Sequence, residues 1–159
     1  MKNKRKIIII VVCVLAVAVI AVCAGVGYYY TRPERTAQKV LTAVYTMDEA
    51  EIQKRREAID NKTFDAYIRD LCDDAVTDNC IDGMITASAL YYGATPAKVE
   101  SIKFSPIDKA TSDTASFQYT AVFSDDSDVK ERIGHVVMKK ENGKWRVNSF
   151  ATKSITRAD

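Results

Sequence analysis

The one histidine of the chain, His135, is the first residue to consider for acid–base chemistry. An imidazole acts as a general acid or base near neutral pH when a carboxylate or hydroxyl group lies beside it. Counting by twos along its strand-like segment, His135 shares a face with Ile133 and Val137, and we expect this face to point into a cavity. Tyr67 and Tyr119 are expected to line the same cavity. His135 and these two tyrosines are therefore the candidate pocket residues.

The sequence assigns no partner to His135. Neither a Ser–His–Asp nor a Cys–His arrangement follows from any spacing in the chain. A surface or structural histidine explains the same alternation. We therefore expect no catalytic residue, no cofactor and a protein that is not an enzyme, and we keep a small pocket enzyme using His135 as the weaker alternative.

The four cysteines fall into two pairs. Cys13 and Cys23 lie inside an apolar run, where a thiol serves as a small apolar side chain. Cys72 and Cys80 have seven residues between them, and in an oxidising compartment a disulfide joining them would contribute about 2.5 kcal/mol. Two independent buried thiols are the alternative. No metal site is expected here, because the C-x₂-C spacing and a nearby histidine are missing.

Aspartates form two clusters. Asp125, Asp126 and Asp128 lack the glycine, the terminal glutamate and the flanking helices of an EF-hand loop, so we interpret them as an exposed hairpin tip. The second cluster surrounds the end of a predicted helix, where carboxylates are electrostatically unfavourable. Nothing in the sequence explains this crowding of Asp70, Asp73, Asp74 and Asp78.

The longest apolar run extends over residues 7–27, IIIIVVCVLAVAVIAVCAGVG, and contains no charged residue. As a helix it would be roughly 31 Å long, about the thickness of the hydrocarbon core of a bilayer. It predicts a single transmembrane helix. A cleaved signal peptide ending near Val22-Cys23-Ala24 and a lipoprotein modified at Cys23 are the alternatives, but a signal sequence has a shorter apolar region.

The residues that flank this run predict its orientation. Basic residues precede it, and cytoplasmic flanks are rich in Lys and Arg. Three tyrosines follow it, as in the aromatic belt at a membrane interface. We expect a cytoplasmic N-terminus and an extracytoplasmic domain, with these residues at the two interfaces: Lys4, Arg5, Lys6, Tyr28, Tyr29 and Tyr30.

The chain thus divides into an anchor with a basic tip, residues 1–30, and a domain, residues 31–159. Four of the 23 basic residues precede the apolar run, which leaves 19 basic against 21 acidic residues in the domain. A mildly acidic domain without a basic cluster is a poor nucleic-acid binder. We expect contact with a membrane and with a protein partner, and none with nucleic acid.

Helices are predicted first in the domain. Pro33 suits the first turn of a helix, and apolar residues at Ala37, Val40, Leu41 and Val44 follow helical spacing. Thr46 to Glu49 has the form of a capping box for a largely solvated second helix. The predicted helices span residues 33–44, 49–59, 64–75 and 81–90.

Strands follow the helices. Alternation places Phe117, Tyr119, Ala121 and Phe123 on one face, and Asn142-Gly143 suits a type I′ hairpin. The predicted strands span residues 99–104, 115–123, 132–140 and 145–150. We expect an α+β domain in which helices cover the concave side of a curved four-stranded antiparallel sheet, giving a cone-like shape.

The C-terminal half is similar to a known superfamily. The segment Asp113–Phe117 and the run VVMKKENGKWRV, residues 136–147, resemble small bacterial membrane-tethered members of the nuclear transport factor 2-like superfamily. This resemblance implies a conical fold with a pocket between sheet and helices. In some relatives such a pocket binds or transforms small molecules, and in others the fold is an interaction module, including a bitopic scaffold component of type IV secretion systems.

These observations lead to one functional hypothesis and one main alternative. The hypothesis is a single-pass, membrane-anchored, extracytoplasmic binding or scaffolding module of a cell-envelope assembly, without catalysis. The alternative is a tethered receptor for a small apolar ligand in the cone pocket. A scaffold predicts that the protein's own side chains fill the cone, whereas a receptor predicts an open apolar cavity of a few hundred Å³.

Overall fold

The computed structural model describes residues 32–88 and 93–157 of the chain. No helix in these two ranges has the length and apolar character needed to cross a membrane. The predicted anchor over residues 7–27 and its interface residues lie outside the described residues. The chain from Pro33 onward forms one unit, close to the predicted domain boundary.

Helix α2 (Pro33–Tyr45) lies across the sheet and begins at the proline, as predicted. Proline suits the first helical position because its missing N–H has no partner there in any case. The predicted apolar stripe is buried and faces the strands, and it continues to Tyr45. Helix α2 therefore contributes five buried residues to the core.

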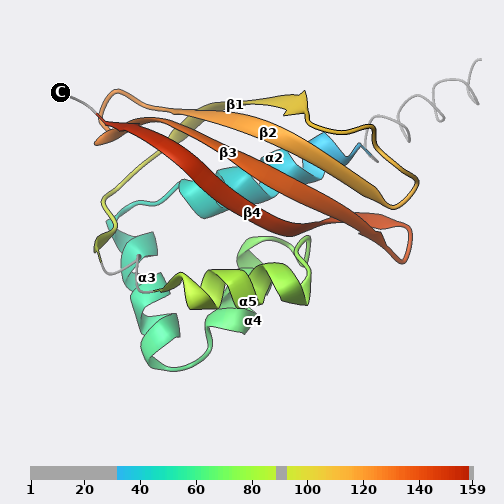
Figure 1. Cartoon of the computed structure of the whole chain (residues 1–159). Helices are drawn as coiled ribbons and strands as arrows, with labels where there is room; N and C mark the ends of the chain where they lie inside the picture. The colour runs from blue at the N-terminus through green and yellow to red at the C-terminus, as the bar shows by residue number, and fades with distance from the viewer. Residues whose placement is uncertain (1–31, 89–92, 158–159) are drawn as a thin grey trace, which may run out of the picture. The chain divides into compact units, whose positions relative to one another are not determined.

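Three shorter helices form the rest of the helical part: α3 (Glu49–Asp60), α4 (Phe64–Leu71) and α5 (Asp78–Thr86). Figure 1 shows them beside α2, on the same side of the sheet. The link between α4 and α5 forms a parallel bridge between Val76 and Val147 in the last strand. This bridge fixes the small helices to the sheet.

The sheet is a curved antiparallel meander in the order β1-β2-β3-β4. Its strands are β1 (Val99–Pro106), β2 (Thr114–Phe123), β3 (Val129–Glu141) and β4 (Lys144–Arg157). Asn142 and Gly143 both have positive φ, at 51° and 78°, as the predicted type I′ turn requires. The predicted α+β class, with helices packed on a curved four-stranded antiparallel sheet, is confirmed.

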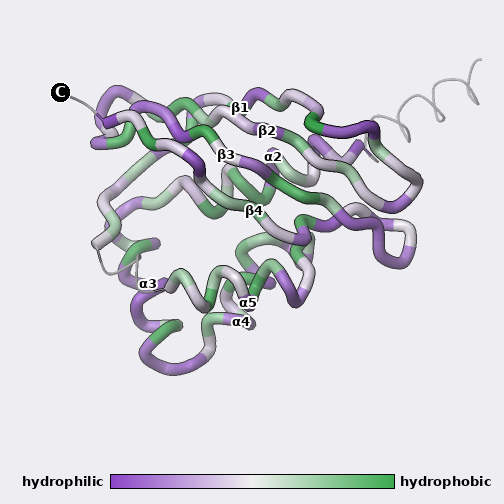
Figure 2. The backbone as a smooth tube through the Cα atoms, in the orientation of Figure 1, coloured by the Kyte–Doolittle hydropathy of each residue, from purple (hydrophilic) through white to green (hydrophobic). Residues whose placement is uncertain are grey.

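The core lies between the sheet and the helices. The β2 face that carries Phe117, Tyr119, Ala121 and Phe123 is buried, as its alternation predicts. In Figure 2 hydrophobic segments lie between the two layers and hydrophilic segments lie at the turns. Helix α2 and β2 thus place aromatic side chains at the centre of the fold.

Several boundaries differ from the sequence prediction. Asp48, and not Thr46, caps α3, because its carboxylate accepts a hydrogen bond from the Glu51 N–H at 2.7 Å. Helix α5 begins at Asp78 behind an N-cap at Thr77 and ends before the predicted end. Strand β4 continues to Arg157, seven residues beyond its predicted end, because β3 begins early at Val129 and pairs with it.

Candidate functional site

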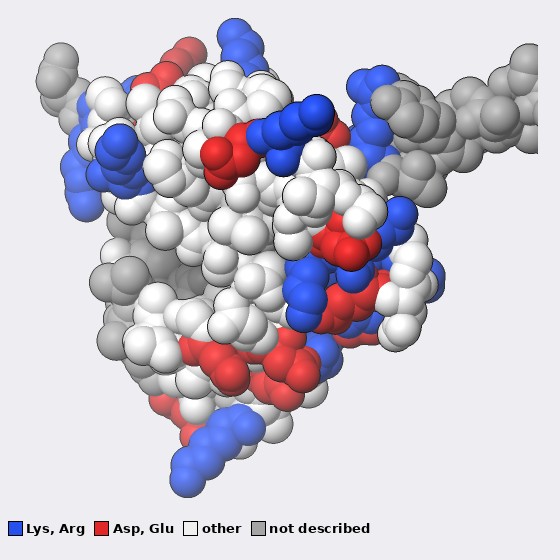
Figure 3. Space-filling view, turned by 45° about the vertical axis from the view of Figure 1, so that its right-hand side comes forward, with Lys and Arg blue, Asp and Glu red and all other residues white. Residues whose placement is uncertain are grey.

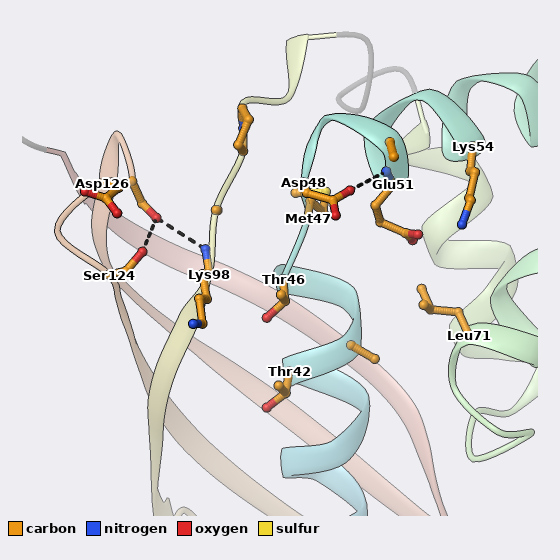
Figure 4. A pocket seen from close by; sticks show the side chains of 15 residues that line it. Thr42, Thr46, Met47, Asp48, Glu51, Lys54, Leu71, Lys98, Ser124 and Asp126 are labelled. Carbon is orange, nitrogen blue, oxygen red and sulfur yellow. Dashed lines mark hydrogen bonds between the residues drawn. The ribbon is translucent and has the colours of Figure 1, made fainter.

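A pocket of about 740 Å³ lies where the end of α2 meets the beginning of α3. The segment that leads into β1 and the β2–β3 turn form its other side, and Leu71 at the end of α4 closes it (Figure 4). The apolar part of its lining, called its apolar floor below, consists of Ala43, Met47, Ala50, Leu71, Pro96 and Ala97. The size and the apolar lining are typical of small-molecule sites.

Backbone hydrogen bonds hold the wall of this pocket in place. The Met47 N–H donates to the Ala97 carbonyl at 2.7 Å, and the Ala97 N–H donates to the Met47 carbonyl at 2.8 Å. The Lys98 N–H donates to the Ser127 hydroxyl at 3.3 Å. These bonds tie the α2–α3 junction to the entry of β1 and to the β2–β3 turn, so the pocket is built from a fixed backbone.

Charged side chains surround the apolar floor. Lys54 extends from α3 toward Leu71, and the Glu51 carboxylate lies beside it (Figure 4). Asp126 and Lys98 lie at the opposite side of the pocket. Neither Lys54 nor Lys98 forms a salt bridge with any residue in the described part of the chain. An apolar ligand with one polar group would match this arrangement.

Arg55 follows the pocket residue Lys54 in α3 and is fully buried, with an exposed fraction of 0%. Its guanidinium donates to the carbonyls of Val44 at 2.7 Å and Ala43 at 3.1 Å. These carbonyls belong to the last turn of α2, where they have no partner inside the helix. Glu51 balances the charge, since its Oε1 accepts from Arg55 Nε at 3.2 Å and from the Tyr67 hydroxyl. The expectation that α3 is solvated on most faces is therefore wrong at Arg55.

The predicted pocket residues do not meet in one cavity. Tyr119 is fully buried in the core, and its hydroxyl lies 2.5 Å from that of Tyr45 and 3.5 Å from that of Thr152. Tyr67 is partly buried on α4 and bonds to Glu51 and Arg55. Neither tyrosine lines the pocket at the α2–α3 junction.

His135 is exposed on the outer face of the sheet, as its interpretation as a surface histidine expects, and it does not point into a cavity as the pocket hypothesis requires. The alternation along β3 is as predicted, because Gly134, Val136 and Met138 are buried and the residues between them are not. The sequence indicates which residues share a face. It does not indicate which face the helices cover.

The concave side of the sheet is filled where Tyr119 lies. Tyr45 packs against Tyr119, Phe123 and Phe150 with ring centroids 6.0–6.1 Å apart, and the guanidinium of Arg132 lies 4.9 Å from the Tyr45 ring centre. Burial is the main cause that raises the pKa of Tyr45 well above its ordinary value. Tyr45 therefore stays protonated over the ordinary pH range, and side chains fill this part of the space between the sheet and the helices.

Cys72 and Cys80 are free, buried thiols in this structure. They match the interpretation as two independent buried thiols and not the possible disulfide. Burial raises the pKa of Cys72 to about 11 and that of Cys80 to about 12, and the neighbouring Cys72 adds to the shift of Cys80. Both thiols remain protonated and poorly reactive at neutral pH.

The raised pKa values of these two thiols predict that the folded protein loses stability in alkali. Their pKa values in the folded chain lie above the ordinary value of 9.0, so their contribution is complete below pH 9 and disappears as the pH rises through 11 and 12. Between pH 8 and 10.5 we expect the free energy of unfolding to fall by on the order of 4 kcal/mol, about 2 kcal/mol for each thiol. Urea unfolding at both pH values measures it. The Cys72→Ala/Cys80→Ala variant should lose less, and an equal loss in the variant would contradict the assignment.

Basic residues pair with three of the four crowded aspartates near the end of α4: Lys39 with Asp73, and two arginines with Asp74 and Asp78. Arg69 pairs with Asp65, Asp74 and Asp78 at 2.9, 3.6 and 2.6 Å. Arg146 from β4 also pairs with Asp74 at 3.1 Å. Figure 3 shows acidic and basic side chains intermingled on one face of the domain. The hydrogen bond from Arg69 lowers the pKa of Asp78.

The described residues contain no group of three or more His, Cys, Asp or Glu side chains placed to hold a metal ion. Sequence reasoning missed Arg55 and the pocket itself. The pocket depends on contacts between segments far apart in the chain, and only the turn residues between Tyr45 and Glu49 gave a local sign of it. Comparison with protein-family models, with curated proteins and with solved structures found no match to this chain.

Proposed function

We propose that this protein is a membrane-tethered, extracytoplasmic binding module without catalysis, and that the pocket at the α2–α3 junction is its ligand site. The tether and its orientation rest on the sequence of residues 1–30, with its basic tip, its apolar run and its tyrosines. The ligand is a small, mainly apolar molecule with one polar group.

The observation that carries the ligand-binding part is the pocket of about 740 Å³ with its apolar floor. The free energy falls when a ligand removes apolar surface of this kind from water. Lys54 and Lys98 at the rim supply donors for the polar group. Tyr45 and Tyr119 are buried in the core and do not line this pocket, so it supports the receptor alternative at a new location.

Filling the pocket tests this proposal. Ala50 is exposed on the first turn of α3 and lines the pocket, whereas Ala66 is exposed on α4 and does not. We expect full-length protein in lipid nanodiscs to enhance the fluorescence of 1-anilinonaphthalene-8-sulfonate after subtraction of empty nanodiscs. Ala50→Trp should remove most of this signal, and the matched control Ala66→Trp should retain it. Equal signals from both variants would refute the pocket as the ligand site.

Protease added to intact cells tests the tether. We expect cleavage of the domain from outside while the N-terminal basic tip stays protected. A protected domain, or a free domain that begins near Gly25, would refute the tethered arrangement and leave the pocket test unaffected.

A further inference from the structure

The outer edge of β4 is covered in its first half and open in its second half. In the first half the Thr77 N–H donates to the Val147 carbonyl at 3.0 Å, and the Val147 N–H donates to the Ala75 carbonyl at 2.9 Å. The Asn79 side chain then donates to the Asn148 carbonyl at 2.9 Å. From Ser149 to Arg157 no backbone hydrogen bond in the described part of the chain joins the outer edge to another segment. We call this stretch, residues 149–157, the open edge.

The open edge is long and accessible. Residues 151–157 are all exposed, and Ile155 keeps 45% of its surface in contact with solvent. Figure 1 shows β4 at the margin of the sheet, with its C-terminal end away from the link between α4 and α5. Unpaired N–H and C=O groups along such an edge form a template for another extended chain.

The opposite margin of the sheet is a poorer template. Strand β1 has eight residues, a register shift near its start between Val99 and Ser101, and a proline at its end. Bulges and prolines are the features that protect an edge from pairing. The open edge of β4 contains no proline, and its protective features are its two basic side chains and a bulge at Lys153, between the pairs Gly134–Thr152 and Ile133–Ser154.

The charge of the open edge identifies the class of partner. The stretch SFATKSITR contains Lys153 and Arg157 and no acidic residue. Side chains directly opposite each other on paired strands attract when their charges differ and repel when they are alike. We propose that the open edge binds an extended, acidic segment of another protein, which adds to the sheet as a fifth strand beside β4.

This inference goes beyond the small-ligand pocket and does not depend on it. A second copy of this chain is disfavoured as the partner, because antiparallel pairing of two open edges over their full length would place Lys153 of one copy opposite Lys153 of the other. An acidic segment meets opposite charges at both Lys153 and Arg157. The bulge lysine thus selects the partner as well as protecting the edge.

Two synthetic peptides test the inference on the full-length protein in nanodiscs. The acidic peptide is acetyl-Thr-Glu-Val-Thr-Val-Glu-Val-Thr-amide, and the basic peptide has Lys in place of Glu. We expect the acidic peptide to bind more tightly and to slow hydrogen exchange of the amides in the open edge, while residues 144–148 stay unchanged. Lys153→Glu should weaken the acidic peptide about fivefold and strengthen the basic one.

Lys103→Glu is the matched control, because Lys103 is an exposed lysine on β1, at the other margin of the sheet. It should leave both affinities unchanged. Protection in β1, equal effects of Lys103→Glu and Lys153→Glu, binding of neither peptide, or dimerisation through the open edge would each overturn the inference. Loss of dye binding in the pocket, in contrast, bears only on the proposed function.

Discussion

Replacing Arg55 by methionine is expected to lower the free energy of unfolding by about 3–5 kcal/mol. Methionine has a similar length but donates no hydrogen bond. The carbonyls of Ala43 and Val44 at the end of α2 would lose their donors, and Glu51 would lose the cation that balances it. Urea unfolding, followed by the fluorescence of Trp145, the one tryptophan of the chain, measures the change.

Two further variants separate the effect of the unpaired Glu51 carboxylate from the effect of the two α2 carbonyls that lose their donors. In Glu51→Gln/Arg55→Met the uncompensated carboxylate is absent, so the double variant should recover about 1–2 kcal/mol relative to Arg55→Met. The carbonyls of α2 would still lack donors, so recovery should be incomplete. Arg55→Lys keeps the charge but lacks the planar fork that reaches both carbonyls, and we expect an intermediate loss. Wild-type stability of Arg55→Met would show that the buried network contributes little.

Replacing Gly134 by alanine is expected to cost about 3 kcal/mol or more. A Cβ at this position would lie 2.5 Å from Cζ of Tyr119, and closer still to the Tyr119 hydroxyl and to the carbonyl oxygen of Ala151. Tyr119 is fully buried on the neighbouring strand, directly opposite Gly134, so its ring has no free space to enter. The backbone of β4 would have to move. Urea unfolding measures this loss as well.

Gly83 provides the matched control. It lies in α5, and a Cβ there would meet nothing within 4 Å. Because alanine favours the helix more than glycine, Gly83→Ala should raise the free energy of unfolding by about 0.5–1 kcal/mol. Replacing glycine by alanine is thus expected to lower the free energy of unfolding at Gly134 and to raise it at Gly83. Equal effects at both would mean that the contact with Tyr119 does not decide the role of Gly134.

The amino-acid sequence determined the features that depend on neighbours in the chain. The stripe Ala37, Val40, Leu41 and Val44, the alternation of β2 and the Asn142-Gly143 turn all lie where their spacing predicts. Each reflects the geometry of one helix, one strand or one turn, and an apolar pattern of period 3.6 or 2 specifies that geometry directly. The α+β class follows, because helices and strands occupy separate parts of the chain.

Only the tertiary structure decided which faces and edges meet. His135 shares a face of its strand with Ile133 and Val137, as the alternation predicts, but that face is the outer one. Arg55 is buried where it donates hydrogen bonds to the last carbonyls of α2. Strand β4 is long because β3 pairs with it as far as Val129. Such outcomes depend on hydrogen bonds and packing between residues far apart in the chain, and no local pattern contains that information. The pocket and the open edge arise in the same way, from segments that come together only when the chain folds.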